Sequence, residues 1–377
     1  MLVGEGLHLT YCTNIHPADG WAAVLESLRT HAPALKARLS PRDPFGIGLR
    51  LSGAESAELL EGDRLERFRG WLDAEGLYVF TINGFPHGRF HGQPVKEQVH
   101  APDWRSEERV AYTLRLAEIL AALLPPDQLG TISTSPLSYG RWIAGDADGW
   151  ERCTGNVIRV ASELRRLREE RGVHVALALE PEADGALADC ADLVRWWDDR
   201  LDREHVMACF DACHAAVAYE EPARALDALG AADIAIGKVQ LSAALTVPLD
   251  GELDRHAVHG RLEGFADRVY LHQVTQRNRD GSLAGFPDLP DGLAAVHDPA
   301  AEELRVHFHV PIFLARYGEL ASTQDHLRRC IDASRSRRAS TQLEIETYTW
   351  DVLPADLKSS VTESIAREYE WVLGVLG

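Results

Sequence analysis

The chain alternates short apolar runs with longer helical patterns along most of its length. The short runs are rich in β-branched and aromatic residues, and the longer segments carry an apolar residue every three to four positions. This alternation is typical of repeated strand–helix units around a parallel sheet. Eight such units predict an α/β fold, a (β/α)8 TIM barrel, with strands expected at 7–12, 46–51, 77–83, 129–135, 174–180, 206–211, 234–241 and 342–347.

Helical patterns separate these runs, and they are expected at 18–39, 65–76, 106–124, 156–172, 187–204 and 323–334. A chain of 377 residues can form one TIM-barrel domain, residues 1–377. The stretch between the seventh and eighth strands is too long for one crossover. We expect an inserted hairpin and loop region over the barrel mouth at about 252–320, with a helix at 253–266, extended chain at 269–273 and 304–313, and a loop at 277–290. An alternative makes 305–310 a barrel strand.

The charge balance excludes some classes of partner. Lys and Arg total 39 against 58 Asp and Glu, a net charge of −19, which repels nucleic acid and attracts divalent cations.

Six cysteines without CxxC spacing argue against a zinc ribbon and a disulfide scaffold. The start of the chain lacks a signal-peptide pattern, and no apolar stretch has transmembrane length. We therefore expect a cytoplasmic protein that acts on a small polar molecule, with no membrane span.

Polar side chains occur where four consecutive strands end. In a parallel barrel the interior is packed, so ionisable groups belong at the carboxyl ends of the strands. The oxygen-bearing candidates there are, in chain order, Glu180, Asp211, Gln240 and Glu346. They predict a site for a divalent cation such as Mn, Zn, Fe, Co or Mg. Alternatively, Asp211 only caps the helix that follows it, with His214 on the first turn.

Four residues on the last two predicted strands leave alternatives open. Glu344 and Glu346 point to the same side of their strand, and Glu346 is favoured because it lies nearer the mouth. Gln240 is a weaker ligand than a carboxylate, and it could equally be a buried amide that satisfies loop backbone. Lys238 shares its face and could hold an anionic substrate or pair with a carboxylate.

Histidines gather where the loops should converge. His16 follows the first strand and His87 the third, whereas His272 lies in the predicted insertion. In RVHFHVP, His307 and His309 alternate with apolar residues, so one face carries two imidazoles. This pair is the best candidate to complete a metal shell if Gln240 does not, although each histidine alone could be structural. Trp350 at the mouth could cover the apolar face of a ring or pack at the rim.

Other chemistries find less support in the sequence. No GxGxxG or GxxxxGK[ST] follows a predicted strand, and no GxSxG elbow occurs. Cys209 and Cys213 flank Asp211, but small thiols beside a buried strand are more often packing residues than ligands or nucleophiles.

These strand-end residues resemble the xylose-isomerase-like barrels, a superfamily that includes the endonuclease IV type. In that superfamily a Glu ends strand five, Asp-x-x-His ends strand six, a His comes from strand seven and a Glu ends strand eight. Glu180, Asp211 with His214 in CFDACHA, and Glu346 match this pattern, whereas Gln240 stands where the family has histidine. The motifs TNIHP, NGFPHG, STSP and HFHVP further resemble the EboE branch, the metabolite traffic proteins.

The resemblance implies a metal-dependent isomerase or epimerase for a sugar, cyclitol or related hydroxy-ketone, in the biosynthesis or traffic of a secondary metabolite and with partner proteins from that cluster. It makes Glu180 and Glu346 the acid/base pair and places His214 on a substrate oxygen. The predicted metal ligands are Glu180, Asp211, Gln240, Glu346 and His309. The predicted substrate-binding residues are His16, Asn83, His87, Lys238 and Trp350. A carrier without catalysis and a metal-dependent hydrolase are the alternative functions.

Overall fold

The computed structural model describes residues 1–4, 6–249, 254–354, 358 and 360–377. It confirms the (β/α)8 barrel, whose eight parallel strands follow the order β1-β14-β7-β6-β5-β4-β3-β2. A bridge between Cys12 and Gly48 joins the two ends of this sheet. The strands are β1 (His8–Tyr11), β2 (Phe45–Arg50), β3 (Leu77–Asn83), β4 (Gly130–Thr134), β5 (Val175–Leu179), β6 (Val206–Asp211), β7 (Ile236–Leu241) and β14 (Gln342–Ile345).

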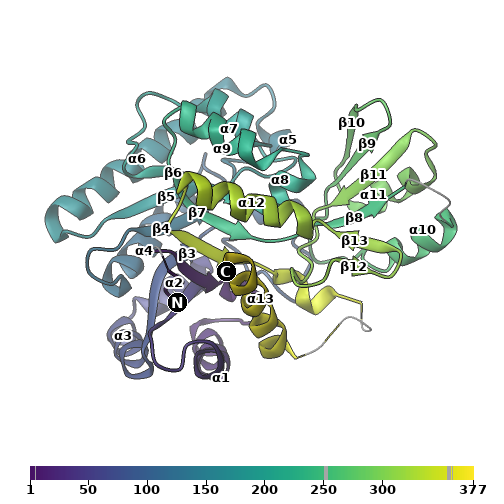
Figure 1. Cartoon of the computed structure of the whole chain (residues 1–377). Helices are drawn as coiled ribbons and strands as arrows, with labels where there is room; N and C mark the ends of the chain where they lie inside the picture. Colours follow the sequence, from purple (N-terminus) through teal and green to yellow (C-terminus); the bar gives the residue numbers. More distant parts are fainter. Residues whose placement is uncertain (5, 250–253, 355–357, 359) are drawn as a thin grey trace.

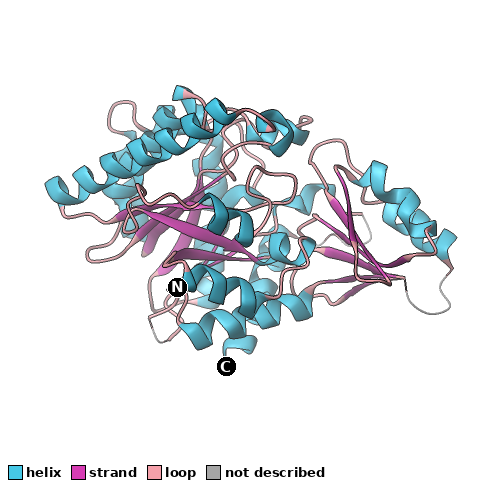
Figure 2. Ribbon diagram, turned by 90° about the horizontal axis from the view of Figure 1, so that it is seen from above, coloured by secondary structure: helices cyan, strands magenta, loops and turns pink. Residues whose placement is uncertain are grey.

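Helices surround the barrel on its outside (Figures 1 and 2). They lie between consecutive strands, as right-handed parallel crossovers require. Each predicted helical segment contains a helix, although the one expected at 187–204 is helical only over Cys190–Trp196. The helices α2, α5, α9 and α13 were not predicted. The bounds are α1 (Trp21–Leu39), α2 (Gly53–Leu59), α3 (Arg64–Glu75), α4 (Glu107–Leu123), α5 (Gly140–Ile143), α6 (Ala147–Arg171), α7 (Cys190–Trp196), α8 (Ala212–Val217), α9 (Pro222–Ala231), α12 (Gln324–Arg337) and α13 (Val361–Leu376). Short 3-10 turns are η1 (Thr13–Ile15), η2 (Lys96–His100), η3 (Leu293–His297) and η4 (Tyr348–Val352).

The chain between β7 and β14 forms a second sheet rather than the expected hairpin and loop. Its six strands pair antiparallel in the order β10-β9-β11-β8-β13-β12, and the sheet stands beside the barrel in Figure 1. The strands are β8 (Leu245–Pro248), β9 (Val274–Asn278), β10 (Leu283–Phe286), β11 (Ala301–Val306), β12 (Arg316–Tyr317) and β13 (Leu320–Ser322), with helices α10 (Arg255–Glu263) and α11 (Leu289–Gly292). The start of the helix predicted at 253–266 falls outside the described residues.

Two predictions about this segment were wrong. The expected loop at 277–290 contains all of β10 and the end of β9, because the residues on either side of a tight turn at Gly281 pair with each other. The alternative that made 305–310 a barrel strand also fails, since Arg305 and Val306 belong to β11 in the second sheet.

The barrel interior contains a polar network. Lys238 forms an ion pair with Glu344 and donates to Thr81 Oγ1 (3.1 Å), and all three side chains are buried. Thr131 continues the network by donating to Gln342 Oε1 (2.6 Å). Lys238 therefore has the carboxylate partner that was one of its two predicted roles, and its ammonium is committed to the barrel core.

Gly48 on β2 makes room for this network. A Cβ atom there would lie 1.7 Å from Glu344 Oε1 and 2.8 Å from the carbonyl oxygen of Tyr11. The obstructing oxygen, Oε1, belongs to a carboxylate whose other oxygen, Oε2, is paired with Lys238, so the carboxylate cannot turn away without disturbing that pair. A glycine is thus required by close approach at this position.

Replacing Gly48 by alanine is expected to lower the free energy of unfolding by about 3 kcal/mol, because either the strand or the buried ion pair must shift. Urea unfolding followed by circular dichroism measures this change. The matched control is Gly155→Ala in α6, where nothing lies within 4 Å of the new Cβ. That variant should gain up to about 1 kcal/mol from helix propensity. Equal stabilities for the two variants would contradict the packing argument.

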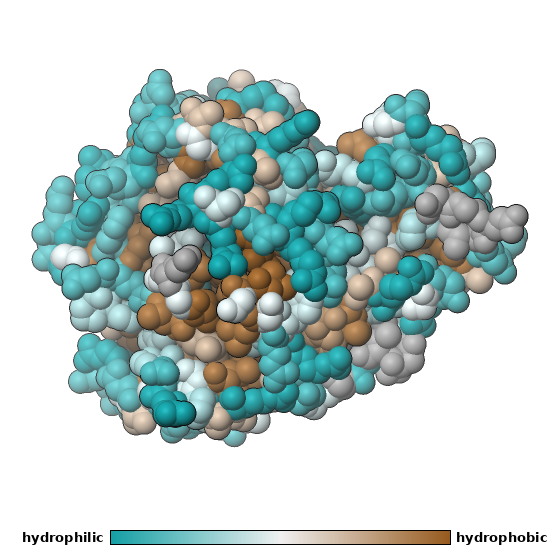
Figure 3. Space-filling model, viewed as in Figure 1, coloured by the Kyte–Doolittle hydropathy of each residue, from teal (hydrophilic) through white to brown (hydrophobic). Residues whose placement is uncertain are grey.

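The molecular surface agrees with the acidic, polar composition. Most of the face in Figure 3 is hydrophilic, and apolar residues gather near its middle. Among the described residues, the exposed large hydrophobic side chains are Leu2 and Leu283. Within that same part of the chain, no helix combines the length and the apolar character that crossing a membrane requires.

Candidate active site

Three carboxylates from different strand ends meet at the mouth of the barrel. Glu180 follows β5, Asp211 ends β6 and Glu346 follows β14. One ligand atom from each lies within 4.8 Å of the others, and all three residues are buried. We call these three residues the carboxylate triad. Residues far apart in the sequence are thus positioned to share one cation, as the strand-end pattern predicted.

The electrostatics of the carboxylate triad are unfavourable without a positive charge. Burial raises the pKa of Glu180 well above its usual value, and the nearby carboxylates of Glu346 and Asp211 raise it further. Burial and the charge of Asp211 likewise raise the pKa of Glu346. Burial would also raise the pKa of Asp211, but His214, His309 and the hydrogen bonds it accepts lower it overall. A divalent cation at this point would compensate the repulsion.

Asp211 caps α8, which is one of its two predicted roles, and its role as a metal ligand remains a prediction. Its Oδ1 accepts hydrogen bonds from the backbone N–H of His214 (2.8 Å), which caps α8, and from Ser242 Oγ (2.8 Å). Its Oδ2 is buried and has no hydrogen-bond partner among the described residues, and the same holds for Glu180 Oε2. Buried oxygens of this kind are what a hard or borderline cation requires, so these residues fit a metal.

Two amides fix Glu346. Asn14 Nδ2 and Asn83 Nδ2 donate to the same oxygen, Glu346 Oε1, at 2.7 and 2.8 Å. Asn83 was predicted to bind substrate; it lines the pocket, and its amide is engaged by this carboxylate. Asn14 was missed, although its position in TNIHP directly after β1 places it at the same end of the barrel. Both amides bond to Oε1, so neither engages Glu346 Oε2.

Imidazoles border the carboxylate triad on one side. His214 Nδ1 lies 3.0 Å from the carbonyl oxygen of Pro181 and 3.7 Å from Glu180 Oε1. His309 Nδ1 lies 2.9 Å from the carbonyl oxygen of Glu346. Asp211, His214 and His309 also have ligand atoms within 4.8 Å of one another. Burial lowers the pKa of His309 to about 3, so its imidazole is neutral and able to bind a metal.

Gln240 lies beneath these groups on β7, in register with Asp211 on one side and Glu344 on the other. Both of its amide atoms are buried, and neither has a hydrogen-bond partner among the described residues. Its predicted role as a metal ligand remains a prediction. His272, another candidate to complete the shell, is bonded to Asp267 and to the carbonyl oxygen of His307 (2.8 Å).

The remaining predicted substrate-binding residues lie elsewhere. His16 contacts Tyr11 Oη (3.1 Å) and stacks on His31, and His87 packs on Tyr112 near Glu108. Lys238 belongs to the barrel core, as described above, and Trp350 is buried in η4. None of the four is among the described residues that line the pocket, because each side chain is already packed against partners of its own.

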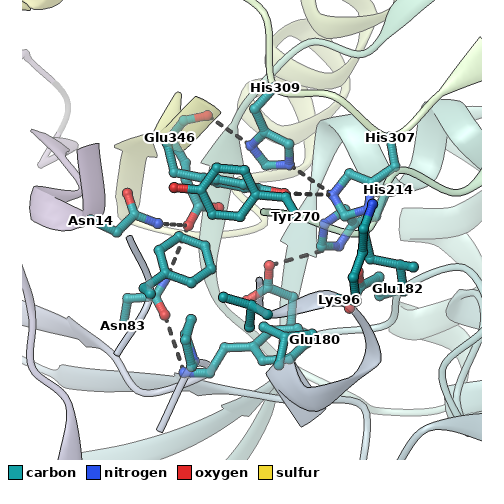
Figure 4. Close-up of a pocket in the computed structure, with 17 residues that line it drawn as sticks. Asn14, Asn83, Lys96, Glu180, Glu182, His214, Tyr270, His307, His309 and Glu346 are labelled. Atoms are coloured by element: carbon teal, nitrogen blue, oxygen red, sulfur yellow. Dashed lines mark hydrogen bonds and ion pairs between the residues drawn. The ribbon is translucent and has the colours of Figure 1, made fainter. Parts of the chain in front are cut away.

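The pocket next to the carboxylate triad has a volume of about 50 Å³. Its polar end carries Glu180, Glu182, His214, His307, His309 and Glu346, which Figure 4 shows gathered around one space together with Asn14 and Asn83. The opposite wall is formed by Phe85, Pro86, Phe90, Val95, Val99, Tyr270, Leu271 and Tyr348. The insertion thus contributes to the site, since Tyr270, His307 and His309 all lie between β7 and β14.

Raised carboxylate pKa values make a pH dependence predictable. Without a cation, folding binds protons at Glu180 and Glu346 that the unfolded chain has already lost, so stability is greatest below their usual pKa and falls as the pH rises. A bound cation replaces these protons. We expect the increase in melting temperature caused by Mn²⁺ to be larger at pH 8 than at pH 5.5. Thermal scans with Mn²⁺ or with chelator measure it, and an equal increase at both pH values would contradict the assignment.

The chain is similar to one known protein family and to several solved structures. The family model described as "Xylose isomerase-like TIM barrel" matches residues 47–274. A solved D-allulose 3-epimerase from Methylomonas sp. is 11% identical, with 100% of each chain covered and a TM-score of 0.53. A D-tagatose 3-epimerase-like protein is also 11% identical, with 98% of this chain and 97% of that chain covered and a TM-score of 0.51. No curated protein matches the chain. At this identity the structural similarity shows the fold.

Proposed function

Because this chain belongs to the xylose isomerase-like TIM barrel family, we propose that it is a divalent-metal-dependent isomerase or epimerase. Its substrate would be a sugar, a cyclitol or a related hydroxy-ketone. The observation that carries the proposal is the carboxylate triad, in which three buried carboxylates from three strand ends lie within 4.8 Å. The names of the two similar structures, both 3-epimerases or epimerase-like, agree with this chemistry.

Glu180, Asp211 and Glu346 would hold the cation. When bound, it supplies Lewis-acid chemistry that acidifies a C–H bond next to a carbonyl group. Glu180 and Glu346 then act as the acid/base pair: one carboxylate takes the proton from carbon, and the other returns a proton, either to the other face of that carbon or to its neighbour.

The other residues position these groups. The hydrogen bonds from Asn14 and Asn83 hold Glu346 in one orientation. His214 has its Nδ1 engaged by the carbonyl oxygen of Pro181, so its Nε2 is free to contact a substrate oxygen. The apolar wall with Phe85 and Tyr270 excludes water and can pack on the carbon face of the substrate.

We further infer a place in the EboE branch and a cytoplasmic role in making or moving a secondary metabolite. The support is the set of motifs TNIHP, NGFPHG, STSP and HFHVP. In the fold TNIHP, NGFPHG and HFHVP supply Asn14, Asn83, His307 and His309 to one pocket.

Isotope labelling tests the proposed reaction. The Mn²⁺-loaded protein is incubated in D₂O with a panel of ketoses and cyclitol ketones, and NMR follows exchange at carbon. An isomerase or epimerase incorporates deuterium at the carbon next to the carbonyl group, and chelator abolishes the exchange. In H₂¹⁸O, incorporation of ¹⁸O through bond cleavage would instead identify a hydrolase. Binding without either exchange would support the carrier.

A further inference from the structure

The pocket beside the carboxylate triad has two chemically different halves. In its polar half, Asn14 Oδ1, Glu180 Oε2 and Glu182 Oε2 are buried and have no hydrogen-bond partner among the described residues. These oxygens are free to accept hydrogen bonds from a ligand or to bind a cation. The side chains that decide the character of the other half are Phe85, Phe90, Val95, Val99, Tyr270 and Tyr348, which we call the apolar wall.

Three aromatic rings of the apolar wall pack on one another. Phe90 lies between β3 and α4, Tyr270 in the insertion and Tyr348 in η4. The ring centres are 5.0 Å apart for Phe90 and Tyr270, 5.1 Å for Phe90 and Tyr348, and 5.2 Å for the two tyrosines. All three residues are buried. Because each ring packs on the other two, this surface is formed before a ligand binds.

The hydroxyl group of Tyr270 is bonded within the protein. His91 Nε2 lies 2.6 Å from the carbonyl oxygen of Asn14, which only accepts, so this nitrogen carries a hydrogen. Burial lowers the pKa of His91, so the ring is neutral and its Nδ1 is an acceptor. Tyr270 Oη donates its hydrogen to that Nδ1 (2.6 Å). Tyr270 therefore has no hydrogen left to donate to a ligand.

The hydroxyl group of Tyr348 is engaged in the same way. Gln273 Nε2 donates to the carbonyl oxygen of Ala183 (3.0 Å), so Gln273 Oε1 is the atom that faces His307 Nδ1 (2.6 Å). That nitrogen carries a hydrogen, and because burial lowers the pKa of His307, its Nε2 is an acceptor. Tyr348 Oη lies 3.4 Å from this Nε2 and donates to it. The polar atoms of both tyrosines thus serve the protein itself.

Backbone groups of the apolar wall are also bonded within the protein. The N–H of Phe85 donates to Asn83 Oδ1 (3.1 Å), and its carbonyl oxygen accepts from Arg109 Nη1 (3.0 Å). The N–H of Val95 donates to the carbonyl oxygen of Val269 (2.7 Å). These peptide groups hold the segment between β3 and α4 against the barrel and the insertion, and they are not available to the hydroxyl groups of a ligand.

The cation next to the apolar wall already has its partners. Lys96 lines the pocket, and its Nζ donates to Asp288 Oδ2 (2.6 Å) and to the carbonyl oxygen of Asp267 (3.1 Å). An anionic or hydroxyl-rich ligand would have to displace Asp288 to gain this ammonium group. The unpartnered oxygens therefore lie at one end of the pocket, whereas the polar groups at the other end are satisfied.

This asymmetry determines which part of a ligand suits each half. A hydroxyl group placed against the apolar wall would lose hydrogen bonds to water that valine and phenylalanine side chains do not replace. A CH₂ group in the same place would bury apolar surface, which is favourable. A ligand with a hydroxyl group on every carbon would bury several of them against Val95 and Val99.

We propose that the substrate is a hydroxy-ketone with a hydrocarbon half. Its two adjacent oxygens would lie in the polar half of the pocket, and carbon atoms without hydroxyl groups would lie against the apolar wall. The proposal rests on the proposed function for the chemistry at the carboxylate triad, and it narrows the substrate class from sugars and cyclitols to hydroxy-ketones with an aliphatic chain or ring.

A matched pair of ligands tests this proposal by binding alone. The compounds 2-hydroxycyclohexanone and pentahydroxycyclohexanone share the ring, the ketone and the adjacent hydroxyl group, and they differ in the hydroxyl groups on the remaining carbons. Calorimetric titration of the Mn²⁺-loaded protein measures both dissociation constants. We expect 2-hydroxycyclohexanone to bind at least about 10-fold more tightly.

Two variants show whether the apolar wall causes this preference. Val95→Thr and Val99→Thr each keep the size of the side chain and add a hydroxyl group that can bond to the ligand. Each should reduce the preference about threefold or more, mainly by improving the binding of pentahydroxycyclohexanone. The matched control is Val194→Thr in α7, outside the pocket, which should keep the preference of the natural chain. Circular dichroism checks that the variants are folded.

Several outcomes would overturn the proposal. They are equal affinities in the natural chain, tighter binding of pentahydroxycyclohexanone, binding of neither compound, and an unchanged preference in both folded wall variants. Deuterium exchange at carbon, measured with the same two compounds, separates this proposal from the proposed reaction. The expected preference without exchange would retain the apolar wall as a binding surface and reject the reaction. Exchange in pentahydroxycyclohexanone alone would retain the reaction and reject the hydrocarbon half.

Discussion

Asp211→Asn is expected to weaken the binding of a divalent cation at the carboxylate triad by about 100-fold or more, while the fold stays nearly as stable as before. The carboxylate at this position has two separable tasks. Its Oδ1 caps α8 through the backbone N–H of His214 (2.8 Å), and its Oδ2 is the oxygen left for a cation. An asparagine side chain keeps a capping oxygen but has no charge. Competition with a fluorescent chelator measures the affinity, and thermal unfolding in chelator measures the stability.

The companion variant Asp211→Ala removes both the metal-binding oxygen and the capping oxygen. Its affinity for the cation should fall as much as in Asp211→Asn, and its free energy of unfolding should also fall by about 1 kcal/mol because the helix cap is lost. If Asp211→Asn kept full affinity at the carboxylate triad, Asp211 would be a capping residue alone. The metal site would then have to be reassigned to the remaining candidates.

The barrel was predictable because each strand repeats the same physical pattern. β3 and β6 begin and end at the predicted residues, since both are mainly apolar buried runs; β3 lies between Gly76 and Gly84, and β6 ends in the acidic Asp211. The carboxylate triad was predictable for the same reason: a carboxylate after a buried run in a parallel barrel must lie at its mouth. Glu180, Asp211 and Glu346 are brought together by topology alone.

The sequence did not predict in which direction side chains in the loops point. His16 and His87 follow strands, as binding residues would, but His16 stacks on His31 and His87 packs on Tyr112. These partners lie on other segments, and the local sequence does not show which segments come close to each other in the fold. The second sheet was missed as a sheet because its strands are short and pair antiparallel across long loops.

Glu182 and Asn14 were missed for a different reason. Glu182 stands in the sequence Glu-Pro-Glu directly after β5, and attention to the second glutamate could have placed it at the mouth. Its partners, Gln273 and His307, come from the insertion, whose docking on the barrel had no signal in the chain. Asn14 becomes significant only when Glu346, 332 positions away, is known to be its partner.

Glu180→Gln and Glu346→Gln are each expected to reduce turnover by about 10³-fold at saturating metal and substrate, because each removes one half of the acid/base pair. Glutamine keeps the size of the side chain and one ligand oxygen, so the substrate affinity of the metal-saturated variants should change little. The assays are the initial rate of proton exchange at carbon and the dissociation constant from calorimetry. Metal content is measured in the same samples, since both residues also belong to the carboxylate triad.

The matched control is Glu118→Gln on the outside of the barrel, which loses a surface ion pair with Arg171 and should keep full turnover. The two active-site variants should also differ from each other in isotope exchange. If one carboxylate takes the proton and the other returns it, the variant that lacks the proton acceptor should lose exchange with solvent, whereas the other should still exchange substrate hydrogen without forming product. Full turnover in either variant would exclude that carboxylate from proton transfer. Equal loss of affinity and turnover would instead mean that both glutamates only hold the cation, and the acid/base groups would have to be sought among the imidazoles of His214, His307 and His309.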